Sequence, residues 1–162
     1  MTIVLIGMPG SGKTTVGQIL ADELGYTFID TDFLIQQQEG MTPKDIVACK
    51  GRDYFLQLQE KVVTGIIPDE KSIISTGGGI VHNEPSMEYL KKIGKIIYLL
   101  TKYDIIEARM DKSRKLVNSG KGLKELFDLR HPLYLEYTDI VINCDKKCAF
   151  DVALEIINVL NN

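Results

Sequence analysis

A glycine-rich stretch near the start of the chain has the residue types and spacing of a phosphate-binding loop. Residues 7–14 have the sequence Gly-Met-Pro-Gly-Ser-Gly-Lys-Thr, which fits the pattern GxxxxGK[ST] between an apolar run and a helix-compatible segment. Glycines let backbone N–H groups turn inward around phosphate oxygens at a helix N-terminus, where partial positive charge favours anions. We therefore predict that the chain binds a nucleoside triphosphate. A glycine turn without a ligand is the alternative, which the strand–loop–helix context disfavours.

Side chains of this loop have distinct expected tasks. Lys13 is placed to reach the β- and γ-phosphates, and the hydroxyl of Thr14 is placed to bind Mg²⁺. The residues expected to contact the nucleotide are Gly10, Ser11, Gly12, Lys13, Thr14 and Thr15.

Two carboxylates, Asp30 and Asp32, follow the short apolar segment at 27–29. Their mutual repulsion is costly unless a cation or a hydrogen-bonding ligand meets them. Asp30 is placed to join the Mg²⁺ ligands, and Asp32 is placed to accept a proton from an attacking hydroxyl. The alternative is that Asp30 or Thr31 caps a helix that begins near Asp32.

Three consecutive glycines follow Thr76. Because a triple glycine costs backbone entropy on ordering, a simple connection does not favour it, although a flexible turn stays the alternative. We predict that a ligand approaches the backbone here, and that the N–H groups bind the acceptor hydroxyl or an oxygen of the transferred phosphoryl group. The residues concerned are Gly77, Gly78 and Gly79.

A polar, cation-rich segment at about 111–122 has the composition of a lid that closes over phosphates. Arg114 is predicted to close on the γ-phosphoryl group, because phosphoryl transfer is helped mainly by positioned positive charge. A solvated basic loop is the alternative interpretation.

These groups need elements to position them, and the chain alternates β-branched apolar segments with helix-period segments. That alternation predicts an α/β fold with a parallel sheet and crossover helices. Ligands of such sheets lie beyond the carboxyl ends of the strands, where the polar groups above are found. The expected strands are 2–6, 27–29, 72–75, 95–100 and 139–143, and the expected helices are 13–24, 51–66, 102–110, 122–136 and 149–160.

Composition narrows the classes of function. The 162 residues, 44% of them hydrophobic, predict a single domain over 1–162. The net charge of −3 and the pI of about 5.4 argue against nucleic acid and favour a small-molecule partner. Met1 leads at once into the first expected strand, and no apolar run approaches about 18 residues. We therefore expect a cytoplasmic protein without a membrane contact.

Cysteines and histidines add no further chemistry. Cys49, Cys144 and Cys148 lack a paired zinc pattern and are predicted to be reduced thiols. His82 and His131 have no nearby nucleophile pattern and are predicted to be surface or capping histidines.

Taken together, the motifs resemble those of the shikimate kinase family, small single-domain P-loop kinases of the nucleoside-monophosphate-kinase type. The resemblance runs the full length and rests on residues 7–14, 30–32, 75–81 and 130–134. It implies a three-layer α/β/α P-loop kinase fold with a five-stranded parallel sheet of order 2-3-1-4-5. It also implies a helical substrate-binding region at about 31–62 and a lid at about 111–122.

The implied activity is transfer of the γ-phosphoryl group of ATP to the 3-hydroxyl of shikimate with Mg²⁺, a step toward aromatic amino acids. A monomer is expected. The resemblance implies Lys13, Asp32 and Arg114 as catalytic residues and Arg109 as the arginine against adenine. The implied metal ligands are Thr14 and Asp30, and the implied substrate-binding residues are Asp32, Gly77, Gly78, Gly79 and Arg130.

One segment departs from the family pattern. Members usually carry Phe-Arg-x-x-Glu, whose arginine is a second clamp on the shikimate carboxylate, and the chain has Phe-Leu-Gln-Leu-Gln at 55–59. Losing a charged contact of about 1.5–3 kcal/mol would weaken binding roughly ten- to hundredfold. Arg52, four residues before Leu56 and on the same expected helix face, is predicted to replace the clamp. A solvated Arg52 is the alternative.

Two other functions stay open at this point. Leu56 and Gln59 favour a P-loop kinase with a different small hydroxyl acceptor. A nucleotide-binding regulatory module without transfer activity is the other possibility, against which the retained Lys13, Asp32 and Arg130 speak.

Overall fold

A computed structural model describes residues 1–110 and 122–162, and a single five-stranded parallel sheet lies at its centre. The sheet order is β2-β3-β1-β4-β5, which confirms the predicted order. The strands are β1 (Ile3–Ile6), β2 (Thr27–Asp30), β3 (Ser72–Ser75), β4 (Lys95–Leu100) and β5 (Ile140–Asn143). The helices are α1 (Lys13–Leu24), α2 (Thr31–Glu39), α3 (Pro43–Lys50), α4 (Arg52–Thr64), α5 (Glu84–Ile93), α6 (Tyr103–Arg109), α7 (Leu123–Tyr137) and α8 (Ala149–Asn161), with a 3₁₀ turn η1 (Ile80–His82).

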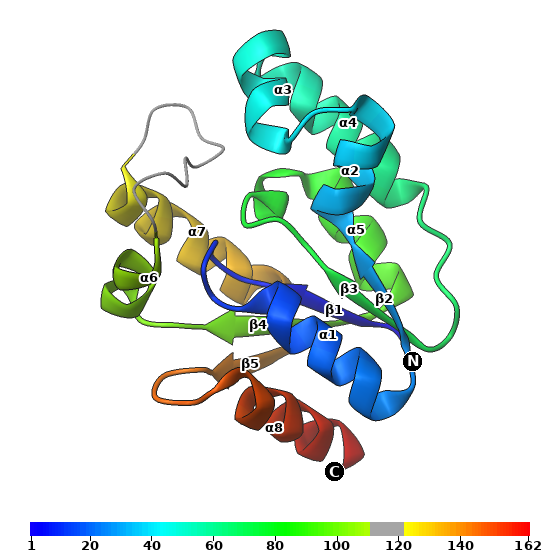
Figure 1. Cartoon of the computed structure of the whole chain (residues 1–162), viewed down its shortest axis with the longest axis vertical. Coiled ribbons are helices and arrows are strands. Elements are labelled where there is room, and N and C mark those ends of the chain that lie inside the picture. The colour runs from blue at the N-terminus through cyan, green and yellow to red at the C-terminus, as the bar shows by residue number, and fades with distance from the viewer. Residues whose placement is uncertain (111–121) are drawn as a thin grey trace.

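Both faces of the sheet are covered, because successive strand residues point to opposite sides. In β1, Ile3 and Leu5 pack with apolar side chains of α1 and α8, whereas Val4 and Ile6 pack with those of α5 and α7. Figure 1 shows α1 and α8 on one face of the sheet and α5 and α7 on the other. The result is the predicted three-layer α/β/α fold.

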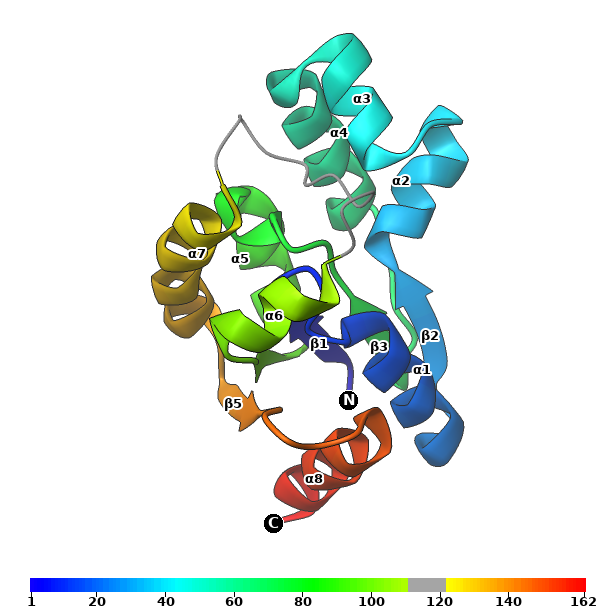
Figure 2. The same cartoon turned by 60° about the vertical axis from the view of Figure 1, so that its left-hand side comes forward.

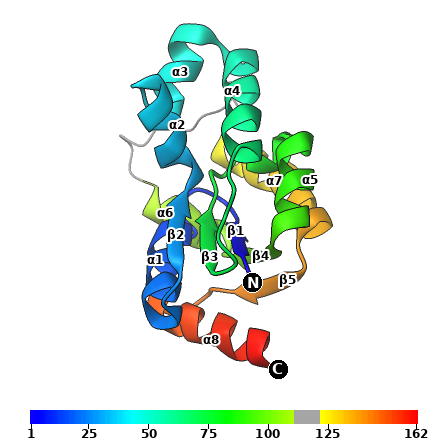
Figure 3. The same ribbon diagram turned by 90° about the vertical axis from the view of Figure 1, so that its right-hand side faces the viewer.

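Helices α2, α3 and α4 form a separate unit beyond the carboxyl ends of β2 and β3, at the position of the predicted substrate-binding region (Figure 3). Their contact is a small apolar cluster of its own, made by Ile35, Ile46, Phe55 and Leu58. Figure 2 shows this unit at the upper right, α7 at the left and α6 near the centre.

Four helices differ clearly from the sequence-based expectation. Helices α2, α3 and α5 were absent from the predicted set, and α5 buries only Ser86, Met87 and Leu90, which is too short a pattern to recognise by periodicity. Helix α4 is shorter than the predicted 51–66, because glycines border it at both ends. Within the described ranges, no helix has the length and apolar character needed to cross a bilayer.

Candidate active site

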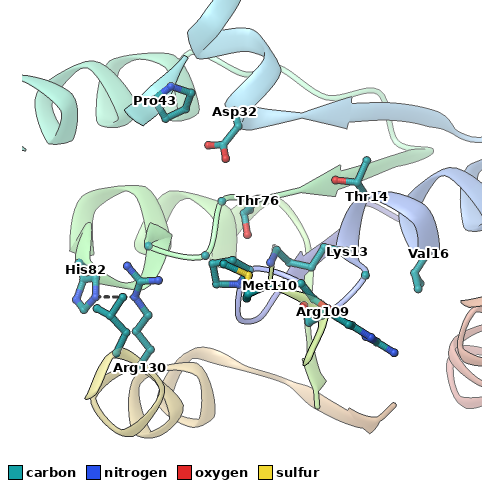
Figure 4. Close-up of a pocket in the computed structure, with 18 of the residues that line it drawn as sticks. Lys13, Thr14, Val16, Asp32, Pro43, Thr76, His82, Arg109, Met110 and Arg130 are labelled. Carbon is teal, nitrogen blue, oxygen red and sulfur yellow. Dashed lines mark hydrogen bonds between the residues drawn. The ribbon is translucent and has the colours of Figure 1, made fainter. Parts of the chain in front are cut away.

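A cleft of about 700 Å³ lies at the carboxyl ends of the strands. Figure 4 shows Lys13, Thr14 and Arg109 on one side of it, His82 and Arg130 on the other, and Asp32 above the space between them. The predicted residues that line the cleft are Gly10, Ser11, Gly12, Lys13, Thr14, Thr15, Asp32, Arg52, Gly77, Gly78, Gly79, Arg109 and Arg130. Segments far apart in the sequence thus meet at one place.

The loop that joins β1 to α1 has the conformation of an anion-binding turn. Gly10 and Gly12 have φ values of 83° and 91°, a left-handed region that side chains other than glycine rarely adopt. Lys13 is buried, and its Nζ donates hydrogen bonds to the carbonyl oxygens of Gly7 at 2.7 Å and Met8 at 2.9 Å. The buried hydroxyl of Ser11 has no hydrogen-bond partner in the described part of the chain. A ligand with several acceptor oxygens fits these donors.

Asp30 caps a helix and also contacts Thr14, the other residue predicted to bind Mg²⁺. One carboxylate oxygen accepts a hydrogen bond from the Phe33 amide at 3.1 Å and caps α2. The other accepts from the Thr14 hydroxyl at 3.4 Å. Since Mg²⁺ prefers oxygen ligands and usually completes its shell with phosphates and water, this pair fits a Mg²⁺–nucleotide complex.

Asp32, at the start of α2, is the acidic residue that lines the cleft within the described part of the chain. Burial raises its pKa to about 6, with a further rise from the charge of Asp30 and an opposing effect of Lys13. A carboxylate that titrates near neutral pH is suited to accept a proton from a hydroxyl group.

The triglycine loop, residues 76–79, allows the other groups to approach closely. A Cβ atom at Gly77 would lie 2.7 Å from Oδ1 of Asp32, and one at Gly78 would lie 2.5 Å from Cδ of Pro9. A Cβ atom at Gly79 would lie 3.2 Å from Nη2 of Arg130. Each glycine therefore admits a different neighbour at the cleft, so this loop is more than a flexible connection.

Arg130, on α7, is only 4% exposed. Its Nε donates to Nε2 of His82 at 3.1 Å, and burial lowers the pKa of its guanidinium while Tyr134 opposes that effect. The Tyr134 hydroxyl in turn donates to the Gly78 carbonyl at 2.6 Å. None of the ion pairs in the part of the chain that the structure describes includes Arg130. Because a buried cation is costly without an anion, this side of the cleft fits an anionic ligand.

The other predicted cations differ in their placement. Nη1 of Arg109 donates to the Gly10 carbonyl at 3.0 Å, so this arginine lies against the phosphate-binding loop. Arg52 is exposed in the first turn of α4, lines the cleft and lowers the pKa of Arg130 through its charge. Arg114 and the lid residues 111–121 lie outside the described residues.

Both histidines make side-chain contacts that the prediction of surface or capping residues did not include. His82 is half-buried and lines the cleft beside Arg130, and His131 is half-buried with Nδ1 at 2.8 Å from the Tyr98 hydroxyl. Gln59 is buried and its Oε1 accepts from Nδ2 of Asn83 at 3.2 Å. The position of His82, three residues after a triglycine loop that ends a strand, was the one available signal.

Comparison with known proteins decides the family. A family model described as shikimate kinase matches residues 9–161. The shikimate kinase of Sulfurihydrogenibium sp. (strain YO3AOP1) is 39% identical over 158 residues, covering 96% of this chain and 95% of that protein. The chain belongs to the shikimate kinase family. The shikimate kinase of Persephonella marina (strain DSM 14350 / EX-H1) is 35% identical over 158 residues, covering 96% of each chain.

Solved structures agree with this membership of the shikimate kinase family. A shikimate kinase from Acinetobacter baumannii in complex with shikimate has a TM-score of 0.88 at 32% identity, covering 99% of this chain and 92% of that chain. The shikimate kinase from Aquifex aeolicus vf5 has a TM-score of 0.86 at 31% identity, covering 99% and 96%. A sugar kinase from Janibacter sp. HTCC2649 reaches 0.67 at 18% identity and shares the fold alone. The predicted P-loop kinase is confirmed, and the alternative functions are not favoured.

Proposed function

We propose that the protein transfers the γ-phosphoryl group of ATP to the 3-hydroxyl of shikimate. The observation that carries this proposal is the buried Arg130, which lies across the cleft from the phosphate-binding loop with Asp32 between them (Figure 4). An acceptor with a carboxylate at one end and a hydroxyl toward the other matches that order of groups. The relative solved with shikimate adds support to the choice of acceptor.

On the nucleotide side, the loop amides and Lys13 would bind the phosphates. Lys13 would exchange its hydrogen bonds to loop carbonyls for phosphate oxygens. Thr14 and Asp30 would hold Mg²⁺, which neutralises developing phosphate charge when it is bound. Arg109 would lie beside the base, and Arg114 would close on the γ-phosphoryl group.

On the acceptor side, Arg130 would bind the carboxylate with Arg52 as the second cation. The amides of the triglycine loop would receive acceptor oxygens. Asp32 would then orient the attacking hydroxyl and accept its proton, while binding at both ends keeps the hydroxyl in line with the phosphoryl group.

Shikimate-dependent release of ADP tests the proposal, with Asp32→Asn measured beside the wild type. We expect shikimate-dependent turnover in the wild type and a loss of about 10²-fold or more in the variant, with the affinity for ATP kept. No turnover with shikimate, while ATP still binds, would reject this acceptor. Because Leu56 presents an apolar side chain to the cleft, a panel of less acidic hydroxyl compounds would then be the second candidate class.

Two further predictions accompany this function. We propose that the protein is a monomer, and the molar mass measured by light scattering after size-exclusion chromatography would test this directly. We also propose a cytoplasmic location, on the sequence features alone.

A further inference from the structure

The contact between His82 and Arg130 has a defined direction. Arginine nitrogens only donate hydrogen bonds, so Nε2 of His82 is the acceptor at 3.1 Å and the ring carries its proton on Nδ1. With Nε engaged, the guanidinium offers a carboxylate the edge formed by its two terminal nitrogens. A bidentate contact on that edge is the strong and directional kind.

Other groups hold the guanidinium in the same place. The backbone at Gly79 is so close that a Cβ atom there would lie 3.2 Å from Nη2 of Arg130 and 4.0 Å from Cδ2 of His82. Tyr134 packs beside Arg130 and donates to the Gly78 carbonyl. His82 therefore engages Nε of the guanidinium, while the Gly79 backbone lies close to Nη2 and Tyr134 packs beside the group.

The orientation of Arg130 is important because helix α4, on the same side of the cleft, contributes few charged side chains. Leu56 is apolar, and Gln59 directs its carbonyl oxygen to Asn83. Arg52 is the cation that α4 contributes to this side of the cleft, and it is exposed. Recognition of a carboxylate therefore depends strongly on the orientation of one buried guanidinium.

We propose that His82 is a positioning residue for the acceptor: by accepting from Nε, it holds Arg130 so that both terminal nitrogens bind the acceptor carboxylate. This inference rests on the proposed function. It predicts that His82 affects the affinity for an acidic acceptor and leaves the chemical step and the nucleotide site unchanged.

The test compares wild type, His82→Ala and His82→Gln with shikimate and with its methyl ester, which lacks the negative charge. For His82→Ala we expect KM for shikimate to rise about tenfold, with kcat and the KM for ATP within about twofold of wild type. The kcat/KM for the ester should be nearly unchanged. Glutamine places an acceptor oxygen at a similar reach, so His82→Gln should recover most of the affinity.

His131→Gln is the matched control, because His131 is the next residue after Arg130 but contacts Tyr98. Its KM for shikimate should stay within about twofold of wild type. An equal loss for shikimate and ester in His82→Ala, a loss in kcat instead of KM, or no loss at all would overturn the positioning role.

Calorimetric titration of shikimate into protein with bound ADP separates this inference from the proposed function. Binding without turnover would overturn the proposed reaction alone, and the ratio of Kd values between wild type and His82→Ala would then decide the role of His82. No binding of shikimate by the wild type would overturn both.

Discussion

The Asp32 carboxyl lies between a second carboxylate, Asp30, and the triglycine loop. Its pKa is raised to about 6, and only its ionised form accepts a proton. We therefore expect kcat/KM for shikimate to fall as the pH is lowered through about 6, because kcat/KM reports the ionisation of the free enzyme. Initial rates at shikimate concentrations well below KM, between about pH 5 and about pH 8, check this, and a kcat/KM that is constant over that range would contradict it.

The same shift affects stability with a defined sign. The folded protein binds the Asp32 proton more tightly than the unfolded chain, whose carboxyl has the ordinary pKa of 3.8. Above about pH 6 the ionised Asp32 carboxylate therefore lowers the free energy of unfolding by its full amount. This destabilisation disappears as the pH falls from about 6 to about 4.

Replacing this carboxylate should consequently stabilise the protein at neutral pH. We expect Asp32→Asn to raise the free energy of unfolding by about 1–3 kcal/mol near pH 7.5 and by clearly less near pH 5. Urea unfolding at both pH values measures the difference. A variant that is less stable than wild type near pH 7.5 would contradict this. It would show that losing the contacts of the carboxylate costs more free energy than removing its buried charge gains.

Motifs predicted most of the residues of the candidate site, because binding a phosphate, a metal ion or a carboxylate each needs one residue type at one spacing. Lys13, Asp32 and Arg130 were all placed in the cleft by their motifs. His82 was missed, since its hydrogen bond joins residues 48 positions apart and depends on how η1 meets α7. Local spacing carries no information about such a contact.

Among the elements, Asn83 joins helix α4 to helix α5. Its Oδ1 accepts from the Ser86 amide and caps α5, and its Nδ2 donates to the Leu56 carbonyl at 2.9 Å and to Gln59. Asn83→Ala should lower the free energy of unfolding by about 2–3 kcal/mol, because it removes a cap and takes this donor away from the buried Oε1 of Gln59.

Thr42→Ala is the matched control for this prediction. Thr42 caps α3 through one hydrogen bond to the Asp45 amide, at an exposed position. Its loss should cost about 1 kcal/mol or less in the same urea experiment. Equal costs for the two variants would mean that the contacts from Asn83 to α4 contribute nothing beyond the cap.

Strands were easier to predict than helices. The predicted segments 72–75 and 95–100 coincide with β3 and β4, because strands covered on both faces are continuous apolar runs. Helices α2 and α3 bury few residues each, Thr31 and Ile35 in one and Ile46 in the other, so their sequences have little helical periodicity. Tertiary contacts and caps define those helices more than their own pattern does.

For the whole molecule, the division of the apolar core predicts a gradient of local stability. The sheet is covered by two large clusters, whereas α2, α3 and α4 share the small cluster around Ile46 and Phe55. Amides of α2 and α3 should therefore exchange with deuterium sooner than those of β1 and β4. Equal protection of both regions in a hydrogen-exchange experiment would contradict this division.

For the molecule as a whole, the sequence was sufficient to predict the family, the order of the strands in the sheet and the three-layer architecture. The order 2-3-1-4-5 came from the family resemblance, because alternation along a chain fixes parallel strands but does not fix which strands are neighbours. The role of Arg114 and the lid stays a prediction, since those residues lie outside the described part of the chain.

The triglycine loop has one more consequence, for the size of the acceptor. Its three successive glycines lie close to Asp32, Pro9 of the phosphate-binding loop and Arg130, so a single short stretch of backbone sets the spacing between the proposed base, the phosphate-binding loop and the proposed carboxylate site. The length of this stretch therefore limits the distance between the two ends of a bound acceptor. We expect a compound with the same carboxylate and hydroxyl groups, one bond farther apart, to bind at one end and leave its hydroxyl out of line, so that the acceptor is selected by length as well as by charge.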